Sequence, residues 1–382
     1  MGKKRPRVRG VVDVGSDTIK ALLFEVNEDG TPRPIEKFVW ELPAAYSVVR
    51  LAQKIRENVF AMVRRVERVP EEILVAFGPT VAECVTSTWR ILPQKYGGVL
   101  TRADIRNYWR GLIAENTDLR RAMIAAPIGF AVNGYPLIWG ENWVSEEILP
   151  YGEVREISFR TLALYMTVEN GAMFAEIKSS LGGMPVEFLP LVVAENEAIA
   201  LSLGVREALV ADIGGDETSL FMIREGRLAE VRFMPMGAKR FASELAKKNG
   251  REDLVESQRA MHQYVQGMGD PRSRALSAEA ASRAAGQWKA LFRRGLEAFY
   301  AAGALPETVL LAGGGARFPE LRRVLQASDW LGAFSHTDTP VLRLLDGAAF
   351  FNGDTLGGHL GGGEDVGLAS LVIYSLSHQP IF

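Results

Sequence analysis

The stretch LVADIGGDETSLF, residues 209–221, contains two apolar strands joined by a glycine turn. The first strand ends on Asp212, and the chain turns at Gly214 and Gly215 before the second apolar run begins. Glycine lets backbone N–H groups approach an anion closely, and a carboxylate at a strand end can hold Mg²⁺ or a water molecule. The pattern therefore indicates a phosphate-binding hairpin, although a glycine pair between two strands is also ordinary hairpin chemistry.

A near copy of this hairpin occurs at the start of the chain, as VVDVGSDTIKALLFE at residues 11–25. It has the same order of an apolar strand, Asp13, Gly15, the small hydroxyl of Ser16, Thr18 and a second apolar strand. The two hairpins lie about 200 residues apart. Such a repeat predicts a duplicated fold in which each half contributes one turn to a shared cleft.

A third glycine-rich element lies in VLLAGGGARF, residues 309–318. An apolar strand is followed there by Gly313, Gly314 and Gly315, and a helical stretch is expected from Pro319. A strand, a glycine run and a helix N-terminus together form a favourable seat for the sugar or phosphate of a nucleotide.

In this order, the three elements resemble the two phosphate motifs and the adenosine motif of the actin, Hsp70 and sugar-kinase superfamily. Within it the chain resembles the bacterial cell-division family FtsA, with the pilus-assembly family PilM as the near alternative. The resemblance implies an α/β, actin-like fold: two RNase H-like halves around a nucleotide cleft, with a small α+β inserted subdomain of the 1C type. It also implies ATP or ADP as ligand, with Mg²⁺ held near Asp13 and Asp212, through water.

The resemblance and the hydrophobic pattern together predict the domain organisation. The predicted parts are a basic N-terminal tail (1–10), the first half, 1A (11–79), the 1C-type insert (80–168), a connecting helix with the return to 1A (169–205), the second half, 2A/2B (206–376), and a C-terminal tail (377–382). Within the insert, Thr101 and Asp104 form a helix-cap pattern. Asn133-Gly134 is a strong hairpin signal there.

The resemblance assigns a set of residues to the nucleotide. They are Asp13, Gly15, Ser16, Asp17, Thr18, Lys20, Asp212, Gly214, Gly215, Asp216, Thr218, Gly237, Glu256, Arg259, Gly313, Gly314, Gly315 and Ala316. For Lys20 the alternative is a solvated edge lysine, and for Glu256 with Arg259 it is a surface ion pair. Glu197 is expected either near the nucleotide or as an exposed helix carboxylate.

Two features depart from the FtsA pattern. The second phosphate motif usually continues Gly-Gly-Gly-Thr-Thr, whereas this chain has Asp216 and Glu217 after Gly215. Two additional carboxylates repel a triphosphate unless a metal or a basic group intervenes. The last residues, His378 to Phe382, are too short to form the amphipathic membrane helix of FtsA proteins, a helix that PilM-like proteins lack.

Composition narrows the protein class. The chain has 382 residues, 47% of them hydrophobic, and a net charge of −2, which predicts two domains with separate cores. A single cysteine, Cys84, excludes an internal disulfide framework and suits a reducing compartment. No apolar run or secretory signal indicates a membrane span or export, so the expected location is cytoplasmic. The resemblance to FtsA implies a position at the inner face of the cell membrane.

Three functions are compared. The leading hypothesis is a cytoskeletal adaptor of cell division that binds ATP, self-associates into filaments and links the FtsZ C-terminal peptide, or other divisome proteins, to the membrane directly or through a partner. The alternative is a PilM-like scaffold that binds a peptide from a membrane protein of a pilus or secretion machinery. A sugar kinase would need a general base and a polar sugar pocket, which the sequence does not indicate. At most a weak ATPase is expected, with no identified catalytic residue and no nucleic-acid partner.

Overall fold

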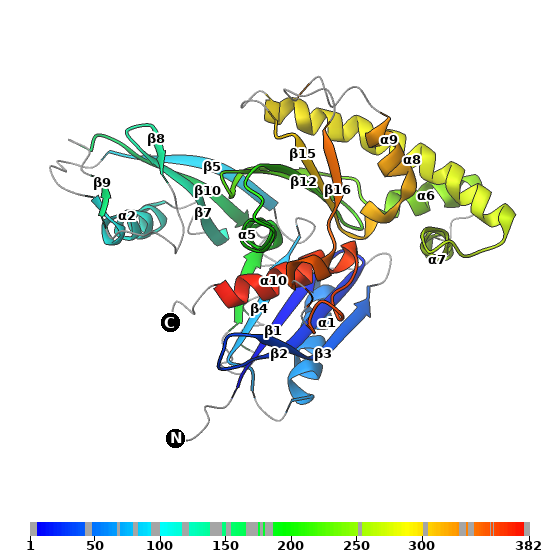
Figure 1. Ribbon diagram of the computed structural model, residues 1–382, viewed down its shortest axis with the longest axis horizontal. Helices are drawn as coiled ribbons and strands as arrows, with labels where there is room; N and C mark the ends of the chain where they lie inside the picture. Colours follow the sequence, from blue (N-terminus) through cyan, green and yellow to red (C-terminus); the bar gives the residue numbers. More distant parts are fainter. Residues whose placement is uncertain are drawn as a thin grey trace.

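The computed structural model of this protein describes most of the chain (Figure 1). The described residues are 6–42, 48–66, 69–78, 83–92, 100–116, 122–137, 147–149, 154–165, 175, 179, 186–250, 254–300, 305–327, 334, 340–351, 353 and 355–377. Within these residues, no helix is both long and apolar enough to cross a bilayer.

The first half is built on a five-stranded sheet. Its elements are β1 (Arg7–Val14), β2 (Thr18–Val26), β3 (Pro32–Glu41), α1 (Val48–Arg64), β4 (Glu72–Phe77) and β11 (Val186–Pro190). The strand order is β11-β4-β1-β2-β3. Strand β1 pairs antiparallel with β2 and parallel with β4, and β2 pairs antiparallel with β3.

The second half repeats this sheet. Its strands are β12 (Ala208–Ile213), β13 (Thr218–Arg224), β14 (Arg227–Met234), β15 (Thr308–Ala312) and β16 (Val341–Leu344). Their order, β14-β13-β12-β15-β16, and their directions match the first half strand for strand. The predicted duplication into two similar α/β halves is therefore confirmed.

Alternating side chains of the first strand in each half serve two different cores, because neighbouring side chains of a strand point to opposite faces. Val12 packs outward with α1, whereas Val11 packs inward, toward the other half. In the second half Leu209 packs outward and Val210 inward. The outer face of this half carries α6 (Lys239–Lys248), α7 (Leu254–Val265), α8 (Pro271–Tyr300) and α9 (Pro319–Gln326).

Two helices are exchanged between the halves. Helix α5 (Leu191–Leu203) follows β11 of the first half but contacts β13 and β14 of the second. Helix α10 (Val366–Ser377) follows β16 of the second half but contacts β1, β2 and β4 of the first. Figure 1 shows α10, in red, lying over the blue sheet beside α5. The two helices and both inner sheet faces share one core, which joins the halves.

Arg9 contributes a polar contact to this junction. The first half begins at Arg7, so the predicted tail of residues 1–10 is too long by four residues. The Arg9 side chain lies buried, 3.7 Å from Glu72 Oε2, and donates to the Ser375 carbonyl of α10. The Ser375 hydroxyl donates to Glu72 over 3.0 Å. A basic residue expected in a solvated tail thus ties the last helix to the first sheet.

The insert lies to one side of both halves, within the predicted range 80–168 (Figure 1). Its elements are β5 (Glu83–Ile91), β6 (Leu100–Thr101), α2 (Arg102–Glu115), β7 (Ala122–Val132), β8 (Tyr135–Leu137), β9 (Glu147–Leu149) and β10 (Ile157–Tyr165). Thr101 and Asp104 form the predicted capping box. Asn133 and Gly134 have the positive φ angles, 50° and 82°, of a tight hairpin turn.

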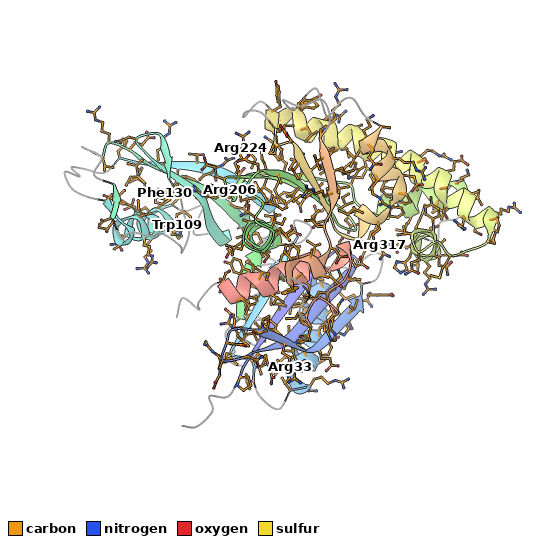
Figure 2. The ribbon with its side chains drawn as sticks, viewed as in Figure 1. Arg33, Trp109, Phe130, Arg206, Arg224 and Arg317 are labelled. Atoms are coloured by element: carbon orange, nitrogen blue, oxygen red, sulfur yellow. The ribbon has the colours of Figure 1, made fainter. Side chains whose placement is uncertain are left out.

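The insert has a core of its own but contacts the second half. Trp109 and Phe130, labelled in Figure 2, pack on Phe159 with ring centroids 5.6 Å and 6.2 Å apart, respectively. Arg160 of β10 forms an ion pair with Glu230 of β14. Of the range 169–205 predicted to connect back to the first half, the residues before 186 lie outside the described residues, apart from 175 and 179.

Candidate functional site

A cavity of about 1140 Å³ lies between the two halves. Both glycine turns line it, together with the glycine run after β15 and residues of α7. Of the predicted site residues, the following line its wall: Asp13, Gly15, Ser16, Asp17, Thr18, Lys20, Asp212, Gly214, Gly215, Arg259, Gly313, Gly314 and Gly315. Three segments far apart in the sequence therefore converge on one cleft, as the duplicated pattern predicts.

Thr218 does not line the cavity and faces the core of the second half. Its hydroxyl donates to the Met236 carbonyl over 2.8 Å and accepts from Trp288 Nε1 over 3.0 Å. Because both partners are buried, this threonine fastens the second turn to α8 rather than offering its hydroxyl to a phosphate.

The other four predicted residues are also outside the wall. Ala316 is buried behind the glycine run, and Glu256 is exposed on α7 while its neighbour Arg259 borders the cavity. Gly237 supports the second turn from behind, because a Cβ on it would lie 2.4 Å from the Gly214 carbonyl oxygen. Asp216 is engaged in the contact between the two turns described below.

Three carboxylates gather beside the cavity at the ends of the two central strands. Asp13 and Asp212 are the penultimate residues of β1 and β12, and Glu195 lies in α5 with its side chain buried. Burial raises the pKa of Asp212 to about 7, with a further rise from the charge of Asp13 and an opposing effect from Lys20. Burial also raises the pKa of Asp13.

Glu195 was missed by the sequence analysis, which considered Glu197 instead. Among the described residues, neither carboxylate oxygen of Glu195 has a hydrogen-bond partner. Burial, followed by the charges of Asp212 and Asp13, raises the pKa of Glu195 well above the usual range. Glu197 accepts a 2.5 Å hydrogen bond from Ser377 in the contact between α5 and α10. Residues two positions apart on a helix point in different directions. The helical periodicity of this segment was therefore the signal that could have distinguished Glu195 from Glu197.

Three basic side chains around the cavity, Lys20, Lys37 and Arg317, are paired with acidic or carbonyl partners. Lys20 donates to the Glu364 carbonyl, which places it in the cleft and not on a solvated edge. Arg317 lies beside the N-terminal end of α10 (Figure 2) and pairs with Glu364 over 2.7 Å. Lys37 pairs with Asp365 and donates to the His359 carbonyl over 3.1 Å. Acidic groups therefore offset the positive charge of the cleft.

The two turns touch each other directly. The Asp216 N–H donates to Ser16 Oγ over 2.9 Å. Lys239, at the start of α6, donates to Asp216 Oδ2 over 2.9 Å and lies 3.1 Å from Asp17 Oδ1. It also donates to the Ser16 carbonyl over 3.1 Å. Lys239 is the basic group that offsets the repulsion expected from Asp216, and sequence reasoning did not identify it because its contacts depend on the assembled halves.

The glycine run after β15 passes close to the second turn. Gly313 has φ of 79°, and a Cβ on it would lie 2.3 Å from Asp212 Oδ1. By contrast, a Cβ on Gly314 would meet no atom within 4 Å, although this residue borders the cavity. The backbone at Gly314 is therefore bare toward the open space of the cleft, as close approach of a ligand requires.

The part of the cavity wall formed by α6, α7 and Phe318 contains several apolar side chains. They are Ala242, Val255, Met261, Val265 and Phe318, and the polar Gln258, Arg259, His262 and Gln263 lie among them. Such a wall suits an aromatic base, whereas the glycine turns suit anionic groups.

The donor set fits a nucleotide with a divalent cation. The bare backbone at Gly314 and the apolar wall suit the nucleoside. The carboxylate of Glu195, which has no hydrogen-bond partner among the described residues, lies beside Asp13 and Asp212 and suits a hydrated cation. Across the described ranges, no three acidic, histidine or cysteine side chains are grouped closely enough to hold a metal ion directly. A cation bound there would offset the charge of both carboxylates and phosphates.

Comparison with known proteins supports the fold. No protein-family profile matches the chain, and no curated protein matches it in a sequence search. A solved PilM–PilN type IV pilus biogenesis complex matches with a TM-score of 0.64 and 18% identity over 95% of this chain and 98% of that one. The ethanolamine utilization protein EutJ from Carboxydothermus hydrogenoformans matches with a TM-score of 0.47 and 12% identity, over 90% and 86% of the two chains.

A diol dehydratase-reactivating factor in nucleotide-free form has a TM-score of 0.48 and 10% identity, over 96% of this chain and 99% of that chain. At these identities the likeness concerns the fold. With its two matching halves and the cleft between them, the chain has an actin-like α/β fold.

Proposed function

We propose that this protein is a nucleotide-binding adaptor that works at the inner face of the cell membrane. The observation that carries the proposal is the convergence of both glycine turns and the glycine run of residues 313–315, with its bare backbone at Gly314, on one cleft. Asp13 and Asp212 at the strand ends would hold Mg²⁺ through water, and the apolar wall beside α7 would hold the base.

Gly314→Leu tests nucleotide binding. A Cβ at this position would meet no atom within 4 Å, and Gly314 borders the cavity, so the leucine should block the ligand and leave the fold intact. Isothermal titration with ADP and Mg²⁺ should show a loss of affinity of roughly tenfold or more. Gly286→Leu is the matched control, because Gly286 lies on the exposed face of α8 with nothing within 4 Å of a Cβ.

The control should bind ADP like the parent protein, and both variants should keep its circular dichroism spectrum. Absence of nucleotide binding in the parent protein would refute the proposed ligand. Equal binding by the parent protein and Gly314→Leu would refute the proposed position of the ligand.

For the partner, we infer an extended peptide of a membrane protein. The likeness to the PilM–PilN complex, which extends over nearly all of both chains, supports this choice. An FtsA-type role, in which the chain self-associates into filaments and tethers FtsZ to the membrane, is the second candidate, favoured by the motif order and the insert between the first two motifs.

The two roles are separated by fluorescence titration with labelled peptides from PilN-type proteins and from the FtsZ C-terminus, together with sedimentation in ADP or ATP. The scaffold role predicts saturable binding of the PilN-type peptide and no nucleotide-dependent pelleting. The tethering role predicts binding of the FtsZ peptide and pelleting with ATP. Binding of neither peptide would contradict both partner assignments.

A further inference from the structure

The contact between the two glycine turns involves three charged side chains, here called the turn latch: Asp17 of the first turn, Asp216 of the second, and Lys239 of α6. The Lys239 ammonium is nearly buried, with 10% of its side chain exposed, and contacts both carboxylates at 3.1 Å and 2.9 Å. The latch therefore joins the two halves at the point where the two glycine turns meet.

The latch leaves little room between the turns. A Cβ placed on Gly215 would lie 2.4 Å from Asp17 Oδ2 and 2.6 Å from Ser16 Oγ, so the backbone of the second turn is already in contact with the side chains of the first. The Asp216 N–H is taken by Ser16 Oγ. A phosphate group can enter between the turns only if they separate and these contacts are lost.

The acidic side chains near the turns also disfavour a phosphate group at this position. Lys239 supplies one positive charge to the two carboxylates of the latch. The cavity wall also contains the acidic Asp13, Asp212 and Glu217 and the basic Lys20 and Arg259, so acidic side chains outnumber basic ones around the turns. Each further phosphate would bring more negative charge close to the acidic side chains of the turns. The protein interior screens the repulsion between these charges much less than water does. The cost rises with the number of phosphates, and the last phosphate of a triphosphate bears most of it.

We propose that the turn latch makes this cleft selective for nucleoside diphosphates over triphosphates. The inference rests on the nucleotide binding proposed above and specifies its ligand class. Asp17 and Asp216 are then specificity-determining residues, because their contacts with Lys239 hold the two turns together. A diphosphate leaves the turns in this closed position, whereas the terminal phosphate of a triphosphate must force them apart.

The test is a comparison of ADP and ATP affinity, each with Mg²⁺, by isothermal titration. The parent protein should bind ADP roughly tenfold more tightly than ATP. In the double variant Asp17→Asn, Asp216→Asn, which keeps the shape of the latch but removes both negative charges, the difference should fall to about threefold or less through a gain in ATP affinity. The single variant Asp216→Asn should lie between the two.

Asp29→Asn is the matched control, because Asp29 is an exposed turn carboxylate that accepts a hydrogen bond from the neighbouring Thr31 backbone N–H. It should retain the parent discrimination. ADP binding by the double variant shows that it is folded, and Asp216→Asn provides the test if the double variant does not fold.

Equal affinity of the parent protein for ADP and ATP would overturn the selectivity. An unchanged ratio in the variants, with ADP still bound, would overturn the role of the latch. Absence of binding of either nucleotide to the parent protein would refute the nucleotide site itself, and the inference with it.

Discussion

Glu72→Ala is expected to lower the free energy of unfolding by about 3 kcal/mol, because it leaves the buried guanidinium of Arg9 without its carboxylate. The two side chains are only 8% and 9% exposed. Arg9 would keep its bond to the Ser375 carbonyl, so the effect should lie at the lower end of the range for broken buried pairs. The Ser375 hydroxyl would also lose its acceptor.

Urea unfolding measures this effect. Glu57→Ala is the matched control: Glu57 pairs with Lys54 on the surface of α1, with 53% of its side chain exposed, and its loss should change stability by about 0.5 kcal/mol or less. The double variant Arg9→Met, Glu72→Met should recover much of the lost stability, because well-packed apolar groups can replace a buried ion pair. A Glu72→Ala effect no larger than that of Glu57→Ala would contradict the assigned role.

Asp212→Asn is expected to stabilise the protein above neutral pH, by roughly 2–4 kcal/mol at pH 8. The folded-state pKa of Asp212 is about 7, above its ordinary value of 3.8. Between these two values the folded protein binds a proton that the unfolded chain has lost, so stability falls as pH rises through this window. Burial is the main cause, Asp13 adds to it and Lys20 opposes it.

The measurement is urea unfolding of parent and variant at pH 4 and pH 8, with EDTA present so that bound cations do not offset the charge. The two proteins should differ least at pH 4, close to the ordinary pKa of 3.8, where the carboxyl is protonated in the folded protein and only about half ionised in the unfolded chain. They should diverge by pH 8. Glu195 and Asp13 titrate in the same cluster, so the variant retains part of the pH dependence. Asp29→Asn, at an exposed carboxylate, should follow the parent protein. A parent protein that gains stability over the variant as pH rises would refute the buried position of Asp212.

Local sequence chemistry predicted the duplicated fold and the position of the cleft. The two Asp-x-Gly turns and the glycine run are formed by consecutive residues, and their backbone requirements are the same wherever the rest of the chain lies. The same holds for Asn133-Gly134 and for the cap at Thr101, whose partners are a few residues away. These features were predicted correctly for that reason.

Contacts between distant residues could not be predicted in this way. Lys239 meets Asp17 only when the halves assemble, and Thr218 turns inward because Trp288 offers it a buried donor. Arg9 looked like part of a charged tail until α10, more than 350 residues later, supplied its partners. In each case the residue type can be read from the sequence, but its interaction partner is brought near only when the chain folds.

The exchange of α5 and α10 bears on how such a chain could arise. Each sheet has its inner face covered by the helix that the opposite half supplies. A polypeptide containing one half alone would expose that face and would gain cover by donating its terminal helix to a second copy and receiving one in return. The present single chain then resembles a fused version of a symmetric, helix-swapped pair, in which one copy has since acquired the insert and the other its longer helical layer.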